Sequence, residues 1–290
     1  MGHRLVDADG VRLHVAEAGS GEPVVCLHGW PQHWWEWRGL IPGLGERYRV
    51  ICPDLRGFGW SEAPREGYEK EQLAADVAAL LDALGLSGVR LIGHDWGGVV
   101  GFILCIRRPD LVSRYLALNT GHLWPPLQAR RLPQLRRFWY QWLISAPILG
   151  TVTVRQLARL PAERSYLLTG RGGAWSEEDT RIFLGQFAER ARARASVQTY
   201  RTFVTRELAA LVTGRYRDER LTVPTLWLHG TRDPVIRPQM LEGARSHADE
   251  LTVELVDGAG HFIADERPEL VLERARGFFA APAGAARSSP

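Results

Sequence analysis

Lysine and cysteine are both scarce in this chain. Lys70 is the only lysine, so arginine supplies every other basic side chain. The three cysteines are Cys26, Cys52 and Cys105, which lie in apolar runs and form no Cys-x-x-Cys spacing. An odd number of cysteines without that spacing argues against a disulfide framework and against a zinc motif. We therefore expect buried, reduced thiols and no metal site.

Long apolar runs are missing as well. No stretch approaches the roughly 18–20 consecutive apolar residues of a membrane-spanning helix. The first ten residues lack the apolar core of a secretory signal peptide, so we expect a cytoplasmic protein. With 290 residues, 45% of them hydrophobic, the chain is long enough to bury the core of one large α/β domain with a sizeable insertion.

The charge of the chain is unevenly distributed. The net charge is +3, yet residues 121–220 hold 17 of the 36 basic residues and only 8 of the 33 acidic ones. A basic segment is thus inserted into an acidic remainder, which favours electrostatic complementarity between two packed parts. No nucleic-acid-binding motif accompanies the arginines, so we expect neither nucleic-acid partners nor stable membrane association. Both a monomer and a homodimer remain open.

Short apolar runs alternate with helical patterns outside that basic segment. The predicted strands are residues 5–7, 12–16, 24–28, 49–53, 89–93, 115–118, 225–229 and 252–256. The predicted helices include residues 70–84, 99–107, 238–247 and 268–279. Such alternation is typical of an α/β fold with a mostly parallel, doubly wound sheet of eight strands flanked by helices.

The alternation stops between residues 121 and 220. This stretch contains several prolines, aromatic clusters and amphipathic patterns such as residues 180–194, but no convincing strand. We therefore predict a core made of residues 1–120 and 221–280, with a helical cap at 121–220 inserted after the sixth strand. Such a cap covers the carboxyl ends of the strands, where α/β sheets bind ligands. We expect residues 281–290 to form a disordered tail.

The most informative motif is Gly-His-Asp-Trp-Gly-Gly at residues 93–98. An apolar strand precedes it and an apolar helical pattern follows, which is the layout of a nucleophile elbow. In such an elbow a tight turn, made possible by Gly93 and Gly97, presents one side chain at its tip. That side chain is usually Ser, but here it is Asp95. A carboxylate nucleophile forms an ester with a substrate carbon, so the reaction differs from acyl transfer.

An elbow of this kind needs a base and an acid that orients the base, in the chain order nucleophile, acid, His. Asp233 and His261 each follow a predicted strand and fit that order. Asn119 follows the preceding strand but cannot supply the charge of an acid. The other histidines at strand ends, which are His28, His94 and His229, fit a structural role because of their order or their lack of freedom to reach the site.

The segment His-Gly-Trp-Pro at residues 28–31 follows another strand. The backbone N–H groups of Trp30 and Trp96 are candidates for an oxyanion hole. The alternative for this segment is an ordinary Gly-Pro loop. A Trp30–Pro31 bond in a tight turn favours the cis isomer more than other peptide bonds do.

Taken together, these motifs resemble those of the epoxide hydrolases with the α/β-hydrolase fold, over nearly the whole chain. The matching segments are residues 28–31, 54–61, 93–98, 230–233 and 260–262. They are specific to the branch that uses an Asp nucleophile and are shared in part with haloalkane dehalogenases. The resemblance implies catalysis by Asp95, with His261 as general base and Asp233 orienting it, and it implies no cofactor.

The resemblance also implies two cap tyrosines that hydrogen-bond the epoxide oxygen. Tyr140, in Phe-Trp-Tyr-Gln at residues 138–141, looks like the first, and Tyr200 matches the second in its Tyr-Arg pair. Tyr166 is the main competitor, and core packing is the alternative for all of them. A small apolar epoxide is the expected partner, in a pocket that includes Trp30, Pro31, Trp96, Trp139 and Phe262.

Two other functions remain open. A haloalkane dehalogenase uses the same triad but needs N–H donors for a halide ion. The indole of Trp96 is one candidate donor; the second is commonly an Asn where this chain has Trp30, although a cap Trp can replace it (Trp124, Trp139, Trp142 or Trp175). A non-catalytic ligand-binding protein on the same fold is the third possibility. The complete triad and the two tyrosines favour epoxide hydrolysis.

Overall fold

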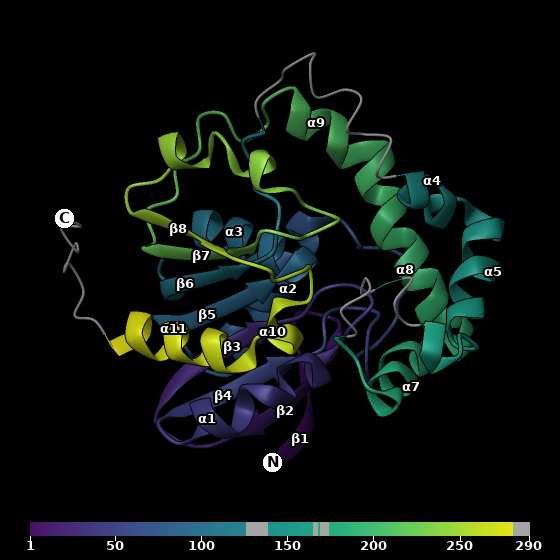
Figure 1. Ribbon diagram of the computed structural model, residues 1–290, viewed down its shortest axis with the longest axis horizontal. Coiled ribbons are helices and arrows are strands. Elements are labelled where there is room, and N and C mark those ends of the chain that lie inside the picture. Colours follow the sequence, from purple (N-terminus) through teal and green to yellow (C-terminus); the bar gives the residue numbers. More distant parts are fainter. Residues whose placement is uncertain (126–138, 165–167, 169–173, 281–290) are drawn as a thin grey trace.

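The computed structural model describes residues 1–125, 139–164, 168 and 174–280, and an 8-stranded sheet lies at its centre (Figure 1). The strands occupy the eight predicted stretches, with ends that differ by at most three residues. They are β1 (Gly2–Asp7), β2 (Arg12–Ala18), β3 (Glu22–Leu27), β4 (Tyr48–Pro53), β5 (Val89–His94), β6 (Val112–Leu118), β7 (Thr225–Gly230) and β8 (Leu251–Val256).

The order of the strands is β1-β2-β4-β3-β5-β6-β7-β8. Only β2 pairs antiparallel, with β1 and with β4, and the remaining neighbours are parallel. The predicted α/β class with a mostly parallel sheet is therefore confirmed. Because parallel strands end at the same edge, the segments after β3, β5, β6, β7 and β8 meet there.

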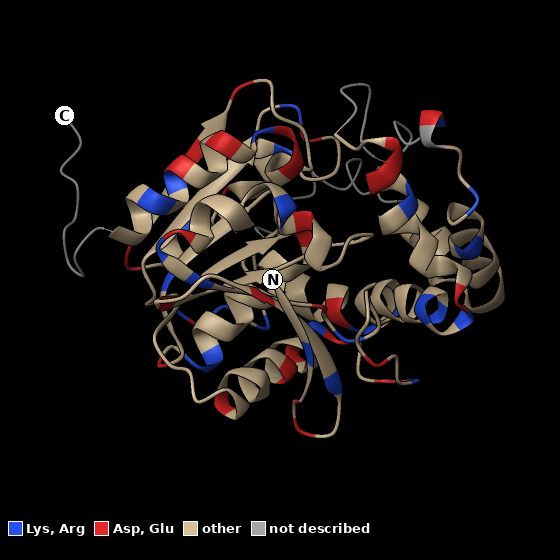
Figure 2. Cartoon of the chain, turned by 90° about the horizontal axis from the view of Figure 1, so that it is seen from below, with Lys and Arg blue, Asp and Glu red and all other residues tan. Residues whose placement is uncertain are grey.

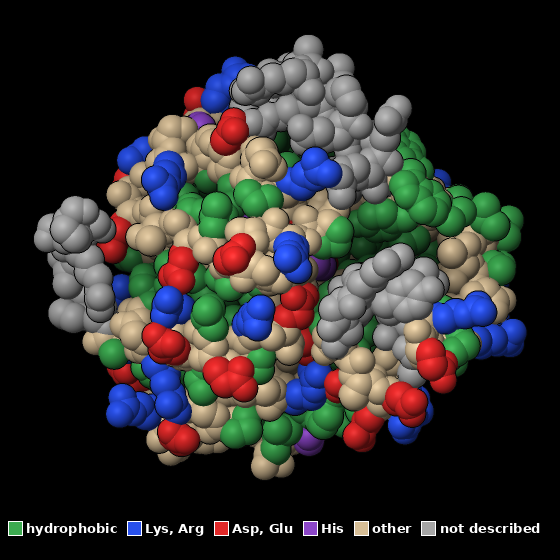
Figure 3. All heavy atoms as spheres, in the orientation of Figure 1, with side chains coloured by type: hydrophobic (Ala, Val, Ile, Leu, Met, Phe, Trp, Pro, Cys, Tyr) green, Lys and Arg blue, Asp and Glu red, His purple; other side chains and the backbone are tan. Residues whose placement is uncertain are grey.

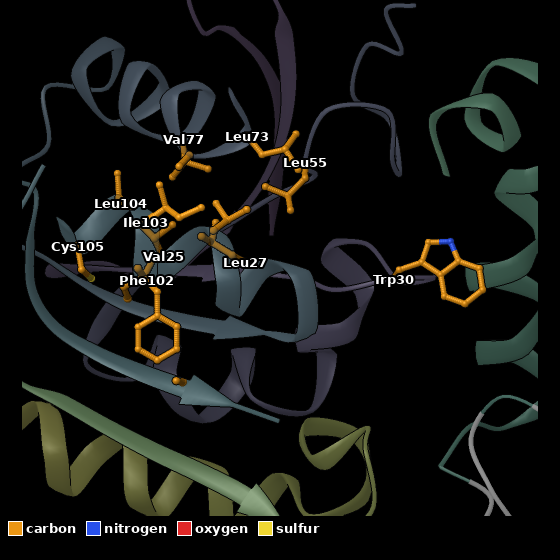
Figure 4. Close-up of a cluster of buried hydrophobic side chains, with 14 of the residues drawn as sticks. Val25, Leu27, Trp30, Leu55, Leu73, Val77, Phe102, Ile103, Leu104 and Cys105 are labelled. Carbon is orange, nitrogen blue, oxygen red and sulfur yellow. The ribbon is translucent and has the colours of Figure 1, made fainter. Parts of the chain in front are cut away.

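Helices cover both faces of the sheet. One face packs against α2 (Lys70–Ala83) and α3 (Asp95–Arg107), and the other against α1 (Ile41–Gly45) and α11 (Pro268–Ala280). Neighbouring residues of β3 point to opposite layers, with Leu27 in the first cluster and Cys26 in the second. Figure 4 shows the first cluster, in which Trp30 stands apart toward the helices beyond the strand ends.

Between β6 and β7 the described residues form helices, which we call the cap. They are α4 (Trp139–Ser145), α5 (Pro147–Leu157), a 3-10 turn (Ala162–Arg164), α7 (Glu177–Gly185), a 3-10 turn (Gln186–Ala188), α8 (Arg190–Thr202), a π-helix (Phe203–Glu207) and α9 (Leu208–Val212). The cap lies to one side of the sheet (Figure 1). Acidic and basic residues are interspersed over the helices of both parts, as Figure 2 shows.

Two predicted helices are wrong in detail. The pattern at residues 180–194 is divided between α7 and α8, because Glu189 is extended (φ −75°, ψ 123°) and ends the preceding turn. The segment 238–247 forms two 3-10 turns, Pro238–Leu241 and Ala244–His247, because Gly243 between them adopts a left-handed φ of 98°. In addition, α3 begins at Asp95 itself, four residues before the predicted start.

Large apolar side chains of α4 and α5 are exposed at the surface of the cap, where Figure 3 shows a green area. They belong to Trp139, Trp142, Ile148, Leu149 and Val152. None of the described helices combines the length and the apolar character needed to cross a bilayer.

Candidate active site

The turn between β5 and α3 places Asp95 at the carboxyl edge of the sheet. Asp95 adopts a φ of 48°, a conformation that is costly for a residue with a side chain and that marks the tip of a sharp turn. A Cβ atom on Gly97 would lie 2.2 Å from the carbonyl oxygen of Leu27, so only glycine allows the helix to approach β3 this closely. Thr120 fixes the turn by donating its hydroxyl to the carbonyl of Asp95 at 2.7 Å.

The fold brings the three predicted catalytic side chains together. His261 Nδ1 lies 2.9 Å from Asp233 Oδ2, and His261 Nε2 lies 3.7 Å from Asp95 Oδ1. The backbone N–H groups of Val235 and Ile236 donate to Asp233 Oδ1 at 2.7 and 2.9 Å. Asp233 and His261 are both buried, so their contacts are little weakened by water.

Charge and burial shift the pKa values of Asp233 and His261 in opposite directions. Burial alone would raise the pKa of Asp233, but His261 outweighs it and lowers the pKa to about 2. Burial alone would lower the pKa of His261, but Asp233 and then Asp95 outweigh it, so the pKa lies above its ordinary value. Asp233 therefore stays ionised, and it keeps the proton of the imidazole on the side away from Asp95.

The loop after β3 provides an N–H group for the nucleophile. The backbone N–H of Trp30 donates to Asp95 Oδ2 at 2.9 Å, which leaves Oδ1 on the side of His261. Gly29 allows this approach, because a Cβ there would lie 2.4 Å from the Asp95 Cβ. The Trp30–Pro31 bond is cis, the isomer that the sequence left open. Within the described chain, the backbone N–H of Trp96 makes no hydrogen bond to the carboxylate.

The two predicted cap tyrosines face the same cavity as Asp95. This cavity, of about 260 Å³, lies between the core and the cap and is walled by Asp95, Trp96, Tyr140, Tyr200, Val99 and Phe203 among others. The tyrosine rings meet edge to face at 6.1 Å. Burial raises the pKa of Tyr140 to about 12 and that of Tyr200 above its ordinary value, so both hydroxyls are proton donors at neutral pH.

The five residues expected in the substrate pocket occupy different positions. Trp96 lines the cavity, whereas Trp30, Pro31 and Phe262 lie outside its wall. The Trp30 indole N–H donates to Ser196 on α8 at 3.1 Å, and Figure 4 shows this indole beside a cap helix. Phe262 packs against the Trp175 ring at 4.7 Å.

The prediction that Trp139 lines the substrate pocket is wrong. Its side chain is 64% exposed and does not line the cavity. The next residue along α4, Tyr140, points inward instead, because successive residues of a helix are turned by about 100°. The competitor Tyr166 and the tail 281–290 lie outside the described residues.

The other histidines at strand ends have structural partners. The Leu55 N–H donates to His28 Nε2 at 2.9 Å, and His229 Nε2 lies 2.8 Å from the carbonyl of Ile236. His94 Nε2 lies 2.8 Å from the carbonyl of His261, which ties the elbow to the loop of the base. Among the described residues, no group of His, Cys, Asp and Glu is arranged to hold a metal ion.

Two buried polar features were missed by sequence reasoning. Asn119 (φ 35°) donates to Asp233 Oδ2 and to the Gly260 carbonyl, both at 2.8 Å, and so positions the acid. Glu36 Oε1 lies 2.9 Å from His94 Nδ1, with both side chains fully buried. Burial alone would lower the pKa of His94, but Glu36 outweighs it and raises the pKa to about 9. The position of Asn119 at a strand end was a usable signal, whereas nothing near Glu36 in sequence indicated its partner.

Comparisons with known proteins agree with this geometry. The family profile described as alpha/beta hydrolase fold matches residues 22–268. The chain is 34% identical to the soluble epoxide hydrolase of Corynebacterium sp. (strain C12), over 96% of this chain and 97% of the relative. It is also 34% identical to epoxide hydrolase A of Mycobacterium tuberculosis (strain ATCC 25618 / H37Rv), over 91% and 93% of the two chains. The solved structure of epoxide hydrolase CorEH without ligand superposes with a TM-score of 0.83 at 32% identity, covering 96% of this chain and 98% of the other.

Proposed function

Since the chain belongs to the α/β-hydrolase fold family, and within it to the epoxide hydrolases, we propose that it converts an epoxide to a vicinal diol. One observation carries the proposal. The carboxylate of Asp95 lies beside a buried His261–Asp233 pair and faces the same cavity as Tyr140 and Tyr200. A nucleophile and two proton donors on one cavity match the needs of epoxide opening.

The first half-reaction opens the ring. Asp95 Oδ1 attacks one ring carbon and forms an ester, while the bond from that carbon to the ring oxygen breaks. The ring oxygen is a poor leaving group unless it is protonated, and Tyr140 and Tyr200 supply the hydrogen bonds and the proton. Their raised pKa values keep them in the acid form at neutral pH.

The second half-reaction cleaves the ester. His261, held by Asp233, removes a proton from water, and the resulting hydroxide adds to the carbonyl carbon of Asp95. The N–H of Trp30 holds the carbonyl oxygen, Oδ2, on which the negative charge develops. Collapse of this intermediate expels the diol oxygen, which receives the proton from His261. The second proton of the water leaves the Asp95 carboxyl group and returns, through solvent, to the tyrosinate left by ring opening, which regenerates both the carboxylate and the tyrosine. The reaction balances as epoxide plus water giving diol.

The cavity supports an apolar substrate. Its wall is formed mainly by side chains such as Val99, Ile103, Leu208 and Val235. A volume of about 260 Å³ lies near the lower end of the range for small-molecule pockets, about 300–1,000 Å³. We therefore propose a small apolar epoxide as the substrate class.

Haloalkane dehalogenation is a second candidate, because the buried indole N–H of Trp96 makes no hydrogen bond of ordinary length, although it interacts with the Tyr200 hydroxyl. A halide site needs a second donor, and two of the suggested tryptophans are engaged elsewhere. Trp124 donates to the Tyr216 carbonyl at 2.7 Å and Trp175 to Asp265 at 3.1 Å. Trp142 lines the cavity but is 60% exposed. These contacts favour the epoxide hydrolase.

Product analysis tests the proposed function. We expect diol formation from styrene oxide and no halide release from chloro- or bromoalkanes of similar size. The variant Asp95→Asn should lose ester formation, and His261→Gln should form the ester without cleaving it, which intact-mass measurement detects as an added substrate mass. Halide release in place of diol formation would contradict the proposal, as would normal turnover by His261→Gln.

A further inference from the structure

The only lysine of the chain lies buried in the wall of the active-site cavity. Lys70 is the first residue of α2, and its side chain is 2% exposed. Its ammonium donates to the Thr199 carbonyl at 2.7 Å and to Glu207 Oε2 at 2.9 Å. An ammonium group is expensive to bury unless it is paired and hydrogen-bonded. These contacts meet that need, and both come from the cap.

Glu207, a residue of the cap, makes a second contact with Lys70 of the core. It ends the π-helix, and its Oε1 accepts the backbone N–H of Lys70 at 2.7 Å. The carboxylate therefore caps the N-terminus of α2, where Glu69 makes no side-chain cap bond. The π-helix begins at Phe203, three residues after Tyr200, and ends at Glu207, and π-helical turns are frequent at functional sites.

The Lys70 ammonium also contacts the residues next to Asp95 and Tyr200 in sequence. It lies 4.4 Å from the ring centroid of Trp96, which follows Asp95 in sequence. The carbonyl that it holds belongs to Thr199, which precedes Tyr200. The rings of Trp96 and Tyr200 meet edge to face at 5.8 Å. One cation thus restrains both the indole beside the nucleophile and the helix that carries the tyrosine.

We propose that Lys70 and Glu207 are positioning residues for ring opening, which hold Tyr200 and Trp96 in place against Asp95 across the boundary between core and cap. The inference rests on the proposed function. The positive charge of Lys70 in a cavity wall shielded from water also favours the negative charge that develops on the substrate oxygen. Ester cleavage needs neither contribution, because His261 and Trp30 perform it.

Burial and the charged groups around Lys70 set its pKa, from which we predict how the rate of ring opening depends on pH. Burial lowers the pKa of Lys70 below its ordinary 10.5, although the carboxylates of Glu207, Glu69 and Asp95 oppose this. Glu69 is also paired with Arg206 at 2.5 Å. The pKa of Tyr140 is raised to about 12, so Lys70 loses its proton before Tyr140 does as the pH rises. The rate of ring opening should therefore fall at alkaline pH.

The test measures ester formation in a His261→Gln parent, in which ring opening is isolated from ester cleavage. Lys70→Met should slow ester formation by on the order of ten- to hundredfold and remove the alkaline fall in rate. Lys70→Arg should restore most of the rate and move the fall to higher pH. In the enzyme with His261 intact, Lys70→Met should leave the rate of ester cleavage nearly unchanged. Arg274→Met, which breaks a partly exposed pair with Glu254, is the control.

Glu207→Gln keeps an oxygen acceptor for the Lys70 N–H and removes the negative charge. If Lys70→Met does not fold, a slower ester formation in Glu207→Gln tests the proposal in its place. Equal slowing of both half-reactions, with an unchanged alkaline fall, would overturn the proposal, as would a Lys70→Met variant that forms the ester at the parent rate. A parent that forms no ester with any epoxide would instead contradict the proposed function.

Discussion

In the proposed mechanism, the pKa of His261 changes during the reaction. In the free enzyme Asp233 and Asp95 both face the imidazole, and together they overcome the effect of burial and raise its pKa. In the proposed mechanism, ester formation would convert Asp95 to a neutral group and remove one of these two charges. The pKa of His261 would therefore fall when the ester forms, which is when a free base is needed to activate water.

This change predicts different pH dependences for the free enzyme and the ester. Since the base acts unprotonated, the rate of ester cleavage falls as the pH falls through the pKa of His261 in the ester. We expect that midpoint at a lower pH than the titration of His261 in the free enzyme. Single-turnover decay of the ester, compared with an NMR titration of His261, measures both. A midpoint at or above the free-enzyme value would contradict the account.

The tyrosine hydroxyls should matter for ring opening alone. Tyr140→Phe and Tyr200→Phe should each slow ester formation by on the order of 10²-fold, the typical effect of removing one donor from a developing oxyanion. Ester cleavage should change little, because neither hydroxyl is used there. Tyr48→Phe, which alters a ring packed against Phe279, serves as the control. Rapid-quench mass measurement separates the two steps, and equal effects on both would refute the assignment.

At the scale of elements, the elbow depends on how closely α3 approaches β3. Gly97→Ala would place a methyl group 2.2 and 2.4 Å from the carbonyl oxygens of Leu27 and His28, which are fixed backbone atoms. We expect a loss of about 3 kcal/mol or more in the free energy of unfolding. Denaturant unfolding measures this loss.

Gly185→Ala is the matched control for the elbow. Gly185 has ordinary helical angles (φ −56°, ψ −31°), and an added Cβ would meet no atom within 4 Å. Alanine there should be neutral or stabilise by up to about 1 kcal/mol. A Gly97→Ala variant as stable as Gly185→Ala would show that the elbow tolerates the methyl group.

The elements that sequence reasoning missed depend on contacts distant in the chain. The helical spacing of apolar residues continues from α7 into α8 without interruption. The chain nevertheless leaves the helix between them, where the Gln186 side chain binds the core. That side chain accepts the Gly59 N–H and donates to the Pro31 carbonyl, both at 2.9 Å. The strands and the ends of β5, β7 and β8 were predictable, because alternation and turn residues are local signals.

At the scale of the molecule, a second, largely buried charge cluster joins the cap to the core. Arg38 contacts Asp179 of α7 at 2.7 Å and Asp265 of α10 (Ile263–Glu266) at 2.5 Å. Trp175 and Gln32 also donate to Asp265. Burial nevertheless raises the pKa of Asp265 to about 6, so the arginine offsets only part of the cost.

Removal of Arg38 should therefore destabilise the whole protein. Arg38→Met leaves the carboxylate of Asp265 buried without its cation, and we expect a loss of about 3–5 kcal/mol at neutral pH. The loss should be smaller below pH 6, because a protonated Asp265 no longer requires the cation. Denaturant unfolding at several pH values measures this loss. The control is Arg274→Met, which breaks a partly exposed pair and should cost about 0–1 kcal/mol. Equal losses in the two variants would contradict the role of the cluster.

The triad was predictable across the whole molecule because Asp95, Asp233 and His261 each follow a strand, and parallel strands end at one edge. The supporting residues were not predictable in the same way. Asn119 lay at the correct edge but had no charge to mark it, and Lys70 pairs with Glu207 across 137 residues of chain. Such pairings are set by how the cap packs on the core, which no local pattern encodes.

The most direct test of the account is one turnover in H₂¹⁸O with enzyme in excess over the epoxide. If Asp95 forms the ester and hydroxide attacks its carbonyl carbon, the label enters the Asp95 carboxylate and the first diol carries none. Mass analysis of the peptide that contains Asp95 and of the diol reads both outcomes. Label in the first diol, with none in Asp95, would mean that water attacks the substrate directly and would contradict the central claim.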